Sequence, residues 1–424
     1  MKRISFISMI FMMFGLTFLT QSCSYDKCHE TLKYQVYVPV VLTNTQLREV
    51  TFDNPRPLKN PGKIYVYGKY LFINELYEGV HIYDNSDIAN PVNLSFISIL
   101  GNVDIAVKED VLYADNYIDL LSFDISDPSN PKFLNSVENV FNSWDKGRER
   151  HVVYYKPTEK FEEIDCSNEN YGNQWINTDR GYVLFSSDGT NKSGYNEAGS
   201  SGASGNVGKG GSMARFTILK NRLYIVDKAD LNVINVENAQ SATYVGKVKI
   251  GWGIETIYPF KDKLFIGSNN GMYVYSTKDE DNPQMLSNFR HARACDPVFV
   301  VGDIAYVTLR SGTRCQGYEN QLDVIDIKNI KTPKLIKSYS MDNPHGLSVL
   351  NNKMVLCEGD YGLKILDIKD SKKIKTKSTI RDKHFYDVIG LSENHILLIG
   401  ANGLFQYELD GYNLNELGSI PIEK

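Results

Sequence analysis

Six ionisable side chains stand at the beginning of short apolar segments that are spaced along the chain. They are Asp104, Arg215, Glu255, Asp296, His345 and Asp387. Carboxylates together with a histidine are the groups that acid–base chemistry and cation binding use. If the fold gathers these side chains, they form one polar binding site. If it does not, each side chain only provides a polar, hydrated end to its own segment.

Other patterns of catalytic or cofactor-binding residues are not found in the sequence. There is no GxSxG elbow, no HExxH motif and no GxGxxG between a strand and a helix. There is also no CxxC or HxxxH cluster of the kind that holds a structural zinc ion. We therefore expect no metal and no cofactor. The net charge of -5 gives no electrostatic reason to expect a nucleic-acid partner.

A five-residue segment with a polar last residue recurs along the chain, as VHIYD at 80–84 and LLSFD at 120–124. The other copies lie at 231–235, 272–276, 322–326, 363–367 and 404–408. Successive copies are 40 or 41 residues apart, except for one step of 111 and one of 50. This spacing predicts a repeat architecture with one long and one short insertion.

Each repeat contains enough sequence for four short strands. In the second repeat, segments 103–107, 111–114 and 120–124 are followed by a turn rich in Asp, Ser and Pro and by segment 132–137. Four strands in about forty residues is the period of a propeller blade. The sequence thus predicts an all-β propeller of seven four-stranded blades over 62–422. Eight blades, or six with an irregular part, are the alternatives.

The segments LLSFDISDPSNP, VHIYDNSDIANP and LDVIDIKNIKTP resemble the LVIVD repeat of exported bacterial proteins. This resemblance implies a β-propeller and export from the cytoplasm, but no catalytic residues. The third and seventh repeats, with NVENAQ and ELDGYN, lack the Pro-containing turn. In a propeller the first strand of each blade lines the central channel, so the six ionisable residues are expected at one mouth of that channel.

The N-terminus has the features of a signal peptide. Lys2 and Arg3 precede a nearly unbroken apolar stretch of sixteen residues, and Thr20-Gln21-Ser22-Cys23 resembles the lipobox of bacterial lipoproteins. We expect 1–22 to be a signal peptide, Cys23 to be the lipidated residue and 23–33 to be a tether. The alternative is an ordinary secretory signal with Cys23 in a disulfide. The expected location is the cell envelope, as an outer-membrane lipoprotein on the periplasmic or the surface side.

Two irregular stretches interrupt the repeats. Residues 34–61 form a lead-in, in which segment 34–44 or 47–52 is expected to pack against the outside of the last blade. Residues 141–212 form an insertion after the second repeat. Its second part, 186–212, contains many Gly, Ser and Asn residues and is predicted to be mobile.

The cysteines of an exported protein can form disulfides. Cys295 and Cys315 belong to one repeat and are the best pair, whereas Cys28 and Cys166 could form another. Cys357 lies in the apolar segment MVLC and is expected to be a buried thiol. A Cys295–Cys315 bridge would hold Asp296 beside loop 310–314 and suggests a fixed recognition loop.

Two classes of function remain. The first is a membrane-anchored propeller that binds a protein, glycan or other envelope ligand without catalysis. The second is a propeller hydrolase or lyase with its site at the channel mouth. We favour the first class because no nucleophile, base and orienting residue can be assembled from the sequence.

The disulfide prediction can be tested on the mature protein. Peptide mapping by mass spectrometry without reduction should recover Cys295 linked to Cys315. A bridge over a loop of this size stabilises the fold by about 3 kcal/mol, so the double variant Cys295→Ser, Cys315→Ser should unfold at a lower urea concentration. Quantitative alkylation of both thiols in the unreduced protein would contradict the prediction.

Overall fold

The computed structural model describes residues 29–141, 147–165, 207–290, 297–310 and 320–423. The predicted signal peptide, the cysteines at 23, 28, 166, 295 and 315, Asp296 and loop 311–314 lie outside these residues. The chain divides into two compact units. The smaller one contains 29–40 and 154–165, and the larger one contains the other described residues.

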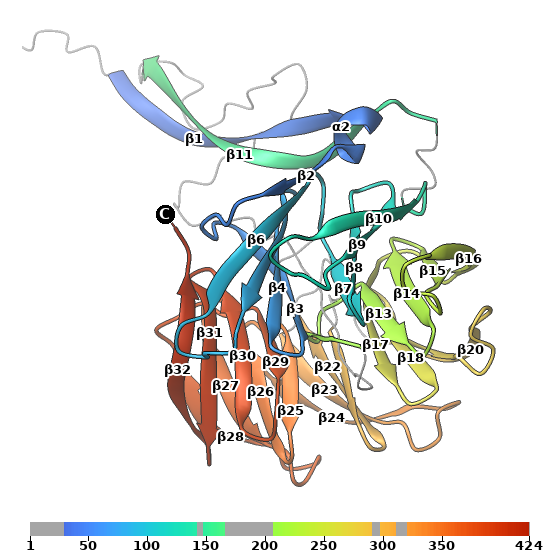
Figure 1. Cartoon of the computed structure of the whole chain (residues 1–424). Helices are drawn as coiled ribbons and strands as arrows, with labels where there is room; N and C mark the ends of the chain where they lie inside the picture. The colour runs from blue at the N-terminus through green and yellow to red at the C-terminus, as the bar shows by residue number, and fades with distance from the viewer. Residues whose placement is uncertain (1–28, 142–146, 166–206, 291–296, 311–319, 424) are drawn as a thin grey trace, which may run out of the picture. The chain divides into compact units, whose positions relative to one another are not determined.

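Six four-stranded antiparallel sheets and one six-stranded sheet follow one another in the larger unit, in the colour order of Figure 1, and each contributes one four-stranded blade. The first three blades consist of β3 (Pro61–Tyr67), β4 (Tyr70–Glu75), β5 (Gly79–Asp84) and β6 (Val92–Ile99); β7 (Ile105–Lys108), β8 (Val111–Asp115), β9 (Leu120–Asp124) and β10 (Lys132–Val137); and β13 (Phe216–Leu219), β14 (Arg222–Asp227), β15 (Asp230–Asn235) and β16 (Thr243–Lys249).

The remaining four blades repeat this order. They consist of β17 (Ile254–Phe260), β18 (Lys263–Ser268), β19 (Gly271–Ser276) and β20 (Gln284–Arg290); β21 (Val298–Val301), β22 (Ile304–Leu309), β23 (Gln321–Asp326) and β24 (Lys334–Ser340); β25 (Leu347–Leu350), β26 (Lys353–Cys357), β27 (Leu363–Asp367) and β28 (Lys375–Ile380); and β29 (Asp387–Gly390), β30 (His395–Gly400), β31 (Gly403–Asp410) and β32 (Asn413–Pro421).

These sheets confirm the predicted propeller with seven blades. All seven recurring segments are third strands, at β5, β9, β15, β19, β23, β27 and β31. The first strands contact one another in sequence around the ring and therefore form its innermost layer. Both faces of the inner strands are apolar because each blade is covered by a neighbour on either side. Phe265 and Val274 of the fourth blade, for example, belong to one buried cluster with Val300 and Val307 of the fifth.

The lead-in does not pack against the last blade as predicted. Strand β2 (Val50–Asp53) pairs with β6 and forms an outer edge of the first blade. Segment 34–44 lies almost entirely in β1 (His29–Thr43), which pairs with β11 (Arg150–Asp165). The last blade needs no added strand, because β29–β32 come from one continuous stretch of chain.

The predicted mobility of 186–212 is wrong at its end. Residues 209 and 210 form strand β12 (Lys209–Gly210), which pairs with β3. Tyr65 of β3 is only 4% exposed beneath this segment. A Gly-rich composition is typical of flexible segments, but at Gly208 the missing side chain permits close packing against the Tyr65 ring. The prediction for Cys357 is confirmed, since its thiol is free and fully buried.

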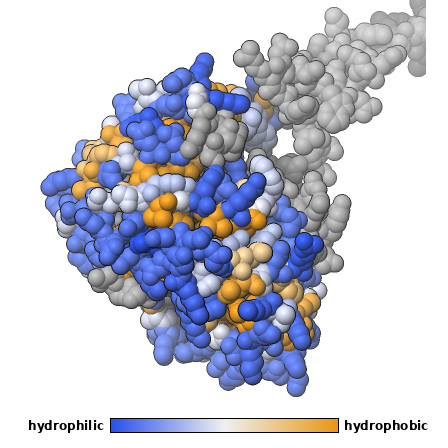
Figure 2. All heavy atoms as spheres, turned by 90° about the vertical axis from the view of Figure 1, so that its right-hand side faces the viewer, coloured by the Kyte–Doolittle hydropathy of each residue, from blue (hydrophilic) through white to orange (hydrophobic). Residues whose placement is uncertain are grey.

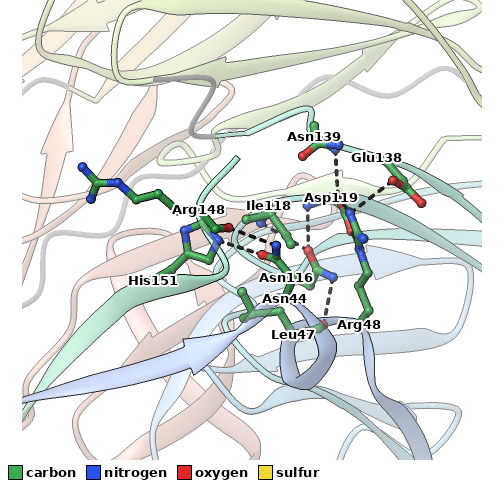
Figure 3. Close-up of polar contacts among 10 residues, drawn as sticks. All are labelled: Asn44, Leu47, Arg48, Asn116, Ile118, Asp119, Glu138, Asn139, Arg148 and His151. Carbon is green, nitrogen blue, oxygen red and sulfur yellow. Dashed lines mark hydrogen bonds and ion pairs between the residues drawn. The ribbon is translucent and has the colours of Figure 1, made fainter. Parts of the chain in front are cut away.

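The short helix α2 (Asn44–Arg48) docks on the second blade (Figure 3). It begins with a capping box between Thr43 and Gln46. Arg48 donates from Nε to Oδ2 of Asp119 over 2.7 Å, and its Nη2 lies 3.2 Å from a carboxylate oxygen of Glu138. The Asn116 side chain donates to the Leu47 carbonyl over 2.9 Å.

The start of the insertion is held by the same helix. The side-chain Nδ2 of Asn44 donates to the carbonyl of Arg148 over 3.0 Å, and the Oδ1 of Asn44 lies 2.8 Å from Nε2 of His151 (Figure 3). The lead-in and the insertion, which are far apart in the sequence, are therefore fixed to one another beside the second blade. No helix in the described part of the chain is long and apolar enough to cross a membrane.

The Arg48–Asp119 contact predicts a measurable contribution to stability. The side chain of Asp119 is 1% exposed, and a hydrogen bond to such a buried charge contributes about 1.5–3 kcal/mol. We expect Arg48→Ala to lower the free energy of unfolding in urea by about 2 kcal/mol. Lys69→Ala breaks a more exposed ion pair with Asp84 of equal length and should cost less than about 1 kcal/mol. Equal effects of the two substitutions would contradict a special role of Arg48.

Candidate functional site

The structure brings the described members of the predicted polar set to the innermost strands. Asp104 and Arg215 immediately precede β7 and β13, Glu255 is the second residue of β17, His345 lies two residues before β25, and Asp387 begins β29. Because these strands have equivalent positions in their blades, the five residues lie toward the same end of the channel. Whether they bind a ligand stays a prediction.

The side chain of Asp104 is hydrogen-bonded to the backbone of Arg215. Oδ2 of Asp104 accepts a hydrogen bond of 2.7 Å from the Arg215 amide, and its Oδ1 accepts one of 2.8 Å from Ile105. The Arg215 side chain reaches Asp227 at 3.4 Å. Burial raises the pKa of Asp104, while the positive charge of Lys63 opposes this shift. Asp104 thus organises the entry to two inner strands.

His345 is half-buried and lies against the buried Arg310. A guanidinium nitrogen of Arg310 lies 2.5 Å from Nδ1 and 2.8 Å from Nε2 of this ring. Burial and the adjacent positive charge lower the pKa of His345, so its imidazole is neutral at pH 7. Burial also lowers the pKa of Arg310 to about 10, although Glu255 opposes this shift. A neutral imidazole beside an arginine can accept a hydrogen bond from it.

Two carboxyl groups of the set have pKa values near neutrality. Burial raises the pKa of Glu255 to about 7, against the positive charges of Arg310, Arg215 and Lys63. Burial also raises the pKa of Asp387 to about 7. Such shifts occur at acid–base sites, but buried structural networks produce them as well. The hydrogen-bond partners of each carboxyl group distinguish an acid–base site from a structural network.

Two further polar residues of the channel region were not singled out in the sequence, and a third, Arg310, was named there only as the start of loop 310–314. Lys63 of β3 donates from Nζ to the carbonyl of Met213 over 3.0 Å. Asp115, at the end of β8, accepts hydrogen bonds of 2.8 Å each from the amides of Val103 and Asp104, and burial raises its pKa to about 6. Arg310 follows β22. The repeat could have identified Lys63 and Asp115, because each stands at a fixed position of its blade.

Two other blades use a carboxylate one register position further along for a similar task, because Asp115 pairs with Leu120, whereas the residues that pair with Val80 and Leu363 are Asn74 and Cys357. Glu75 ends β4 and accepts a hydrogen bond of 3.0 Å from the Lys59 amide and another from the Asn60 amide. Glu358 follows β26 and accepts 2.7 Å bonds from the amides of Asp342 and Asn343. A carboxylate at or just after the end of the second strand therefore holds the loop that enters the first strand. Asp115 has this structural role through its own bonds to the amides of Val103 and Asp104.

The channel itself contains a segment of the chain. Residues 207–215, which we call the channel segment, run alongside β3 and then enter β13. Residues 210–214 are all buried. Asp387 packs against this segment, since a Cβ atom at Gly211 would lie 2.0 Å from Oδ2 of Asp387. Two of the predicted channel-mouth carboxylates thus contact this segment, Asp387 at Gly211 and Asp104 at the Arg215 amide.

The described residues offer no obvious metal site, because no group of three or more His, Cys, Asp or Glu side chains among them could hold an ion. A concave surface does occur on the outside of the ring. It lies between the edge strand β2 and the turn before β10, and its lining residues are Phe52, Asp53, Asn54, Ser95, Ser129, Asn130, Pro131 and Lys132.

This outer groove, as defined by those eight residues, is flanked by exposed aromatic rings. Phe52 is 45% exposed and Phe133 is 48% exposed, and both contact the buried ring of Phe123 edge-on. Elsewhere, Figure 2 shows hydrophobic residues in small groups between hydrophilic ones on the face toward the viewer. The outer groove therefore combines a free strand edge with two aromatic contacts for an extended ligand.

The raised pKa of Glu255 predicts a change in the pH dependence of stability. Between pH 4.5 and 7 the folded state keeps the proton that the unfolded state has lost, so this group makes the free energy of unfolding fall as pH rises. Glu255→Gln should reduce that fall in urea titrations. Glu416→Gln is the control, because Lys383 lowers the pKa of Glu416 and its titration lies below this window. An unchanged profile for Glu255→Gln would contradict the shift.

Comparison with known proteins extends the description of the fold. No protein-family model and no curated protein sequence matches the chain. The computationally designed protein Ika8 is similar with a TM-score of 0.52 and 9% identity, over 87% of this chain and 92% of that chain. Sqt1 of Saccharomyces cerevisiae is similar with a TM-score of 0.51 and 7% identity, over 91% of this chain and 90% of that chain. At such low identity these likenesses concern the propeller fold alone.

Proposed function

We propose that this chain is an exported, lipid-anchored propeller of the LVIVD-repeat type that binds a protein ligand of the cell envelope and does not catalyse a reaction. The observation that carries the binding role is the passage of the channel segment along the innermost strands. Residues 210–214 are buried at the place where a channel-mouth enzyme would need a substrate. The outside of the ring, in contrast, offers the outer groove with its exposed rings.

The polar residues of the channel support this proposal through their partners. Asp104 and Asp115 accept backbone hydrogen bonds from the entries to inner strands. Asp387 accepts a 2.9 Å bond from the amide of Val388 and packs on the channel segment. A carboxylate with these partners holds backbone in place and is poorly available to a substrate.

A hydrolase or lyase remains the alternative, and one observation favours it. Glu255 and Asp387 both have pKa values of about 7, which suits groups that gain and lose protons at neutral pH. This alternative requires the channel segment to leave the channel during turnover. A glycan ligand at the outer groove is a further outcome that the binding experiment can reveal.

The binding role can be tested by photo-crosslinking in intact cells. A photoreactive residue at position 133, beside the outer groove, should form a discrete adduct with an envelope protein. The same residue at position 335 is the matched control, because Leu335 is also the second residue of an outer strand and is 49% exposed. Identical adduct patterns at both positions, or none at position 133, would contradict binding at this groove.

The lipid anchor can be tested separately. We expect the full-length protein to incorporate a fatty-acid probe and to sediment with membranes when expressed in its bacterial host. Cys23→Ser should abolish both, because the thiol that accepts lipid is removed. Cys28→Ser should leave both unchanged. Equal labelling of the two variants would show that Cys23 is not the lipidated residue.

A further inference from the structure

The channel segment is in contact with most of the ring. On the second blade, Val207 forms a backbone bridge with Lys108, and the Gly208 amide donates to the Val107 carbonyl over 3.0 Å. On the first blade, Lys209 and Gly210 pair with Val66 and Tyr65 as strand β12. The segment therefore extends the innermost edge of the first blade by one strand.

The same segment then reaches blades on the opposite end of the sequence. Lys209 donates from Nζ to the carbonyl of Leu391, which follows β29 of the seventh blade, over 3.4 Å. The Ser212 hydroxyl accepts a 2.7 Å hydrogen bond from the amide of Leu347, the first residue of β25 in the sixth blade. Two blades from the start of the chain are thus connected to two blades from its end.

Two glycines make this close passage possible. A Cβ atom at Gly208 would lie 2.4 Å from the Tyr65 ring and 2.8 Å from the Val66 carbonyl oxygen. A Cβ atom at Gly211 would overlap the buried carboxyl group of Asp387. Contacts of this length are not compatible with any side chain, so the sequence of the segment is matched to the walls of the channel.

The first and last blades share no strand, so the ring closes through contacts between separate sheets. β3–β6 and β29–β32 each come from one continuous stretch of chain. Their direct contacts include an apolar cluster with Leu71 and Leu397 and a bond of 2.7 Å from the Tyr386 hydroxyl to the Pro61 carbonyl. A stack of sheets that is open at this joint would expose both of its end faces.

We propose that the channel segment is the closing strand of the ring, which ties the first and second blades to the sixth and seventh through the channel. The end of the insertion is then a part of the propeller fold. Because the segment pairs by backbone hydrogen bonds and by Ser212, its loss should weaken the joint between the first and seventh blades before it weakens the other joints.

The test uses the mature chain with Gly208→Ala. Amide hydrogen exchange followed by mass spectrometry should become about tenfold faster or more in β3, β29 and β30, as expected when a local hydrogen-bonded unit opens more often. Exchange in β22 and β23 of the fifth blade should stay unchanged. Gly246→Ala is the matched control, because a Cβ atom there meets nothing within 4 Å.

A second pair of variants covers the case in which Gly208→Ala does not fold. Ser212→Ala removes only the acceptor of the Leu347 amide, and it should speed exchange at the start of β25 and in β29. Ser287→Ala removes another buried serine bond between blades, to the Ile330 carbonyl at 2.6 Å, and should leave β25 and β29 unaffected. Exchange that increases equally around the ring, or equally in variant and control, would overturn the proposal.

Discussion

The structure depends on the closure of its ring. Each blade is a twisted four-stranded sheet with apolar side chains on both faces, and burial of both faces requires a neighbour on each side. Blades in the middle of the sequence receive these neighbours from chain continuity, as the shared cluster of the fourth and fifth blades illustrates. The first and seventh blades have to find one another across the full length of the chain, which is the slow and entropically costly contact. The channel segment contacts both the first and the seventh blade and can stabilise the joint between them.

Closure through the channel also gives a consistent account of the buried charges. Asp104, Asp115 and Asp387 accept amide hydrogen bonds close to the channel segment or to the strands beside it. A buried carboxyl group is costly unless it is paired with donors, and its raised pKa records that cost. In this account the polar channel is a structural device. On the outside of the ring, β2 is the outermost strand of its sheet among the described residues, and the rings of Phe52 and Phe133 are exposed there.

Much of the fold could be predicted from the sequence, because the repeated strand is a local pattern of alternating apolar residues. It located all seven third strands and placed the starts of the first strands at the channel. The channel segment could not be predicted, because a Gly-rich composition occurs both in mobile loops and in segments that pass close to other backbone. Its role depends on Tyr65 and Asp387, which are far away in the sequence. The docking of Arg48 on Asp119 was missed for the same reason, as was the pairing of the lead-in with the first blade.

The most direct measurement of the central claim is amide hydrogen exchange of residues 207–215 in the unmodified mature protein. The account predicts that the amides of Gly208 and Gly210, and that of Leu347, which donates to Ser212, are protected to the same degree as those of the innermost strands. Exchange of residues 207–215 within seconds, together with protected strands β3 and β29, would show that the ring closes without them and would contradict the account.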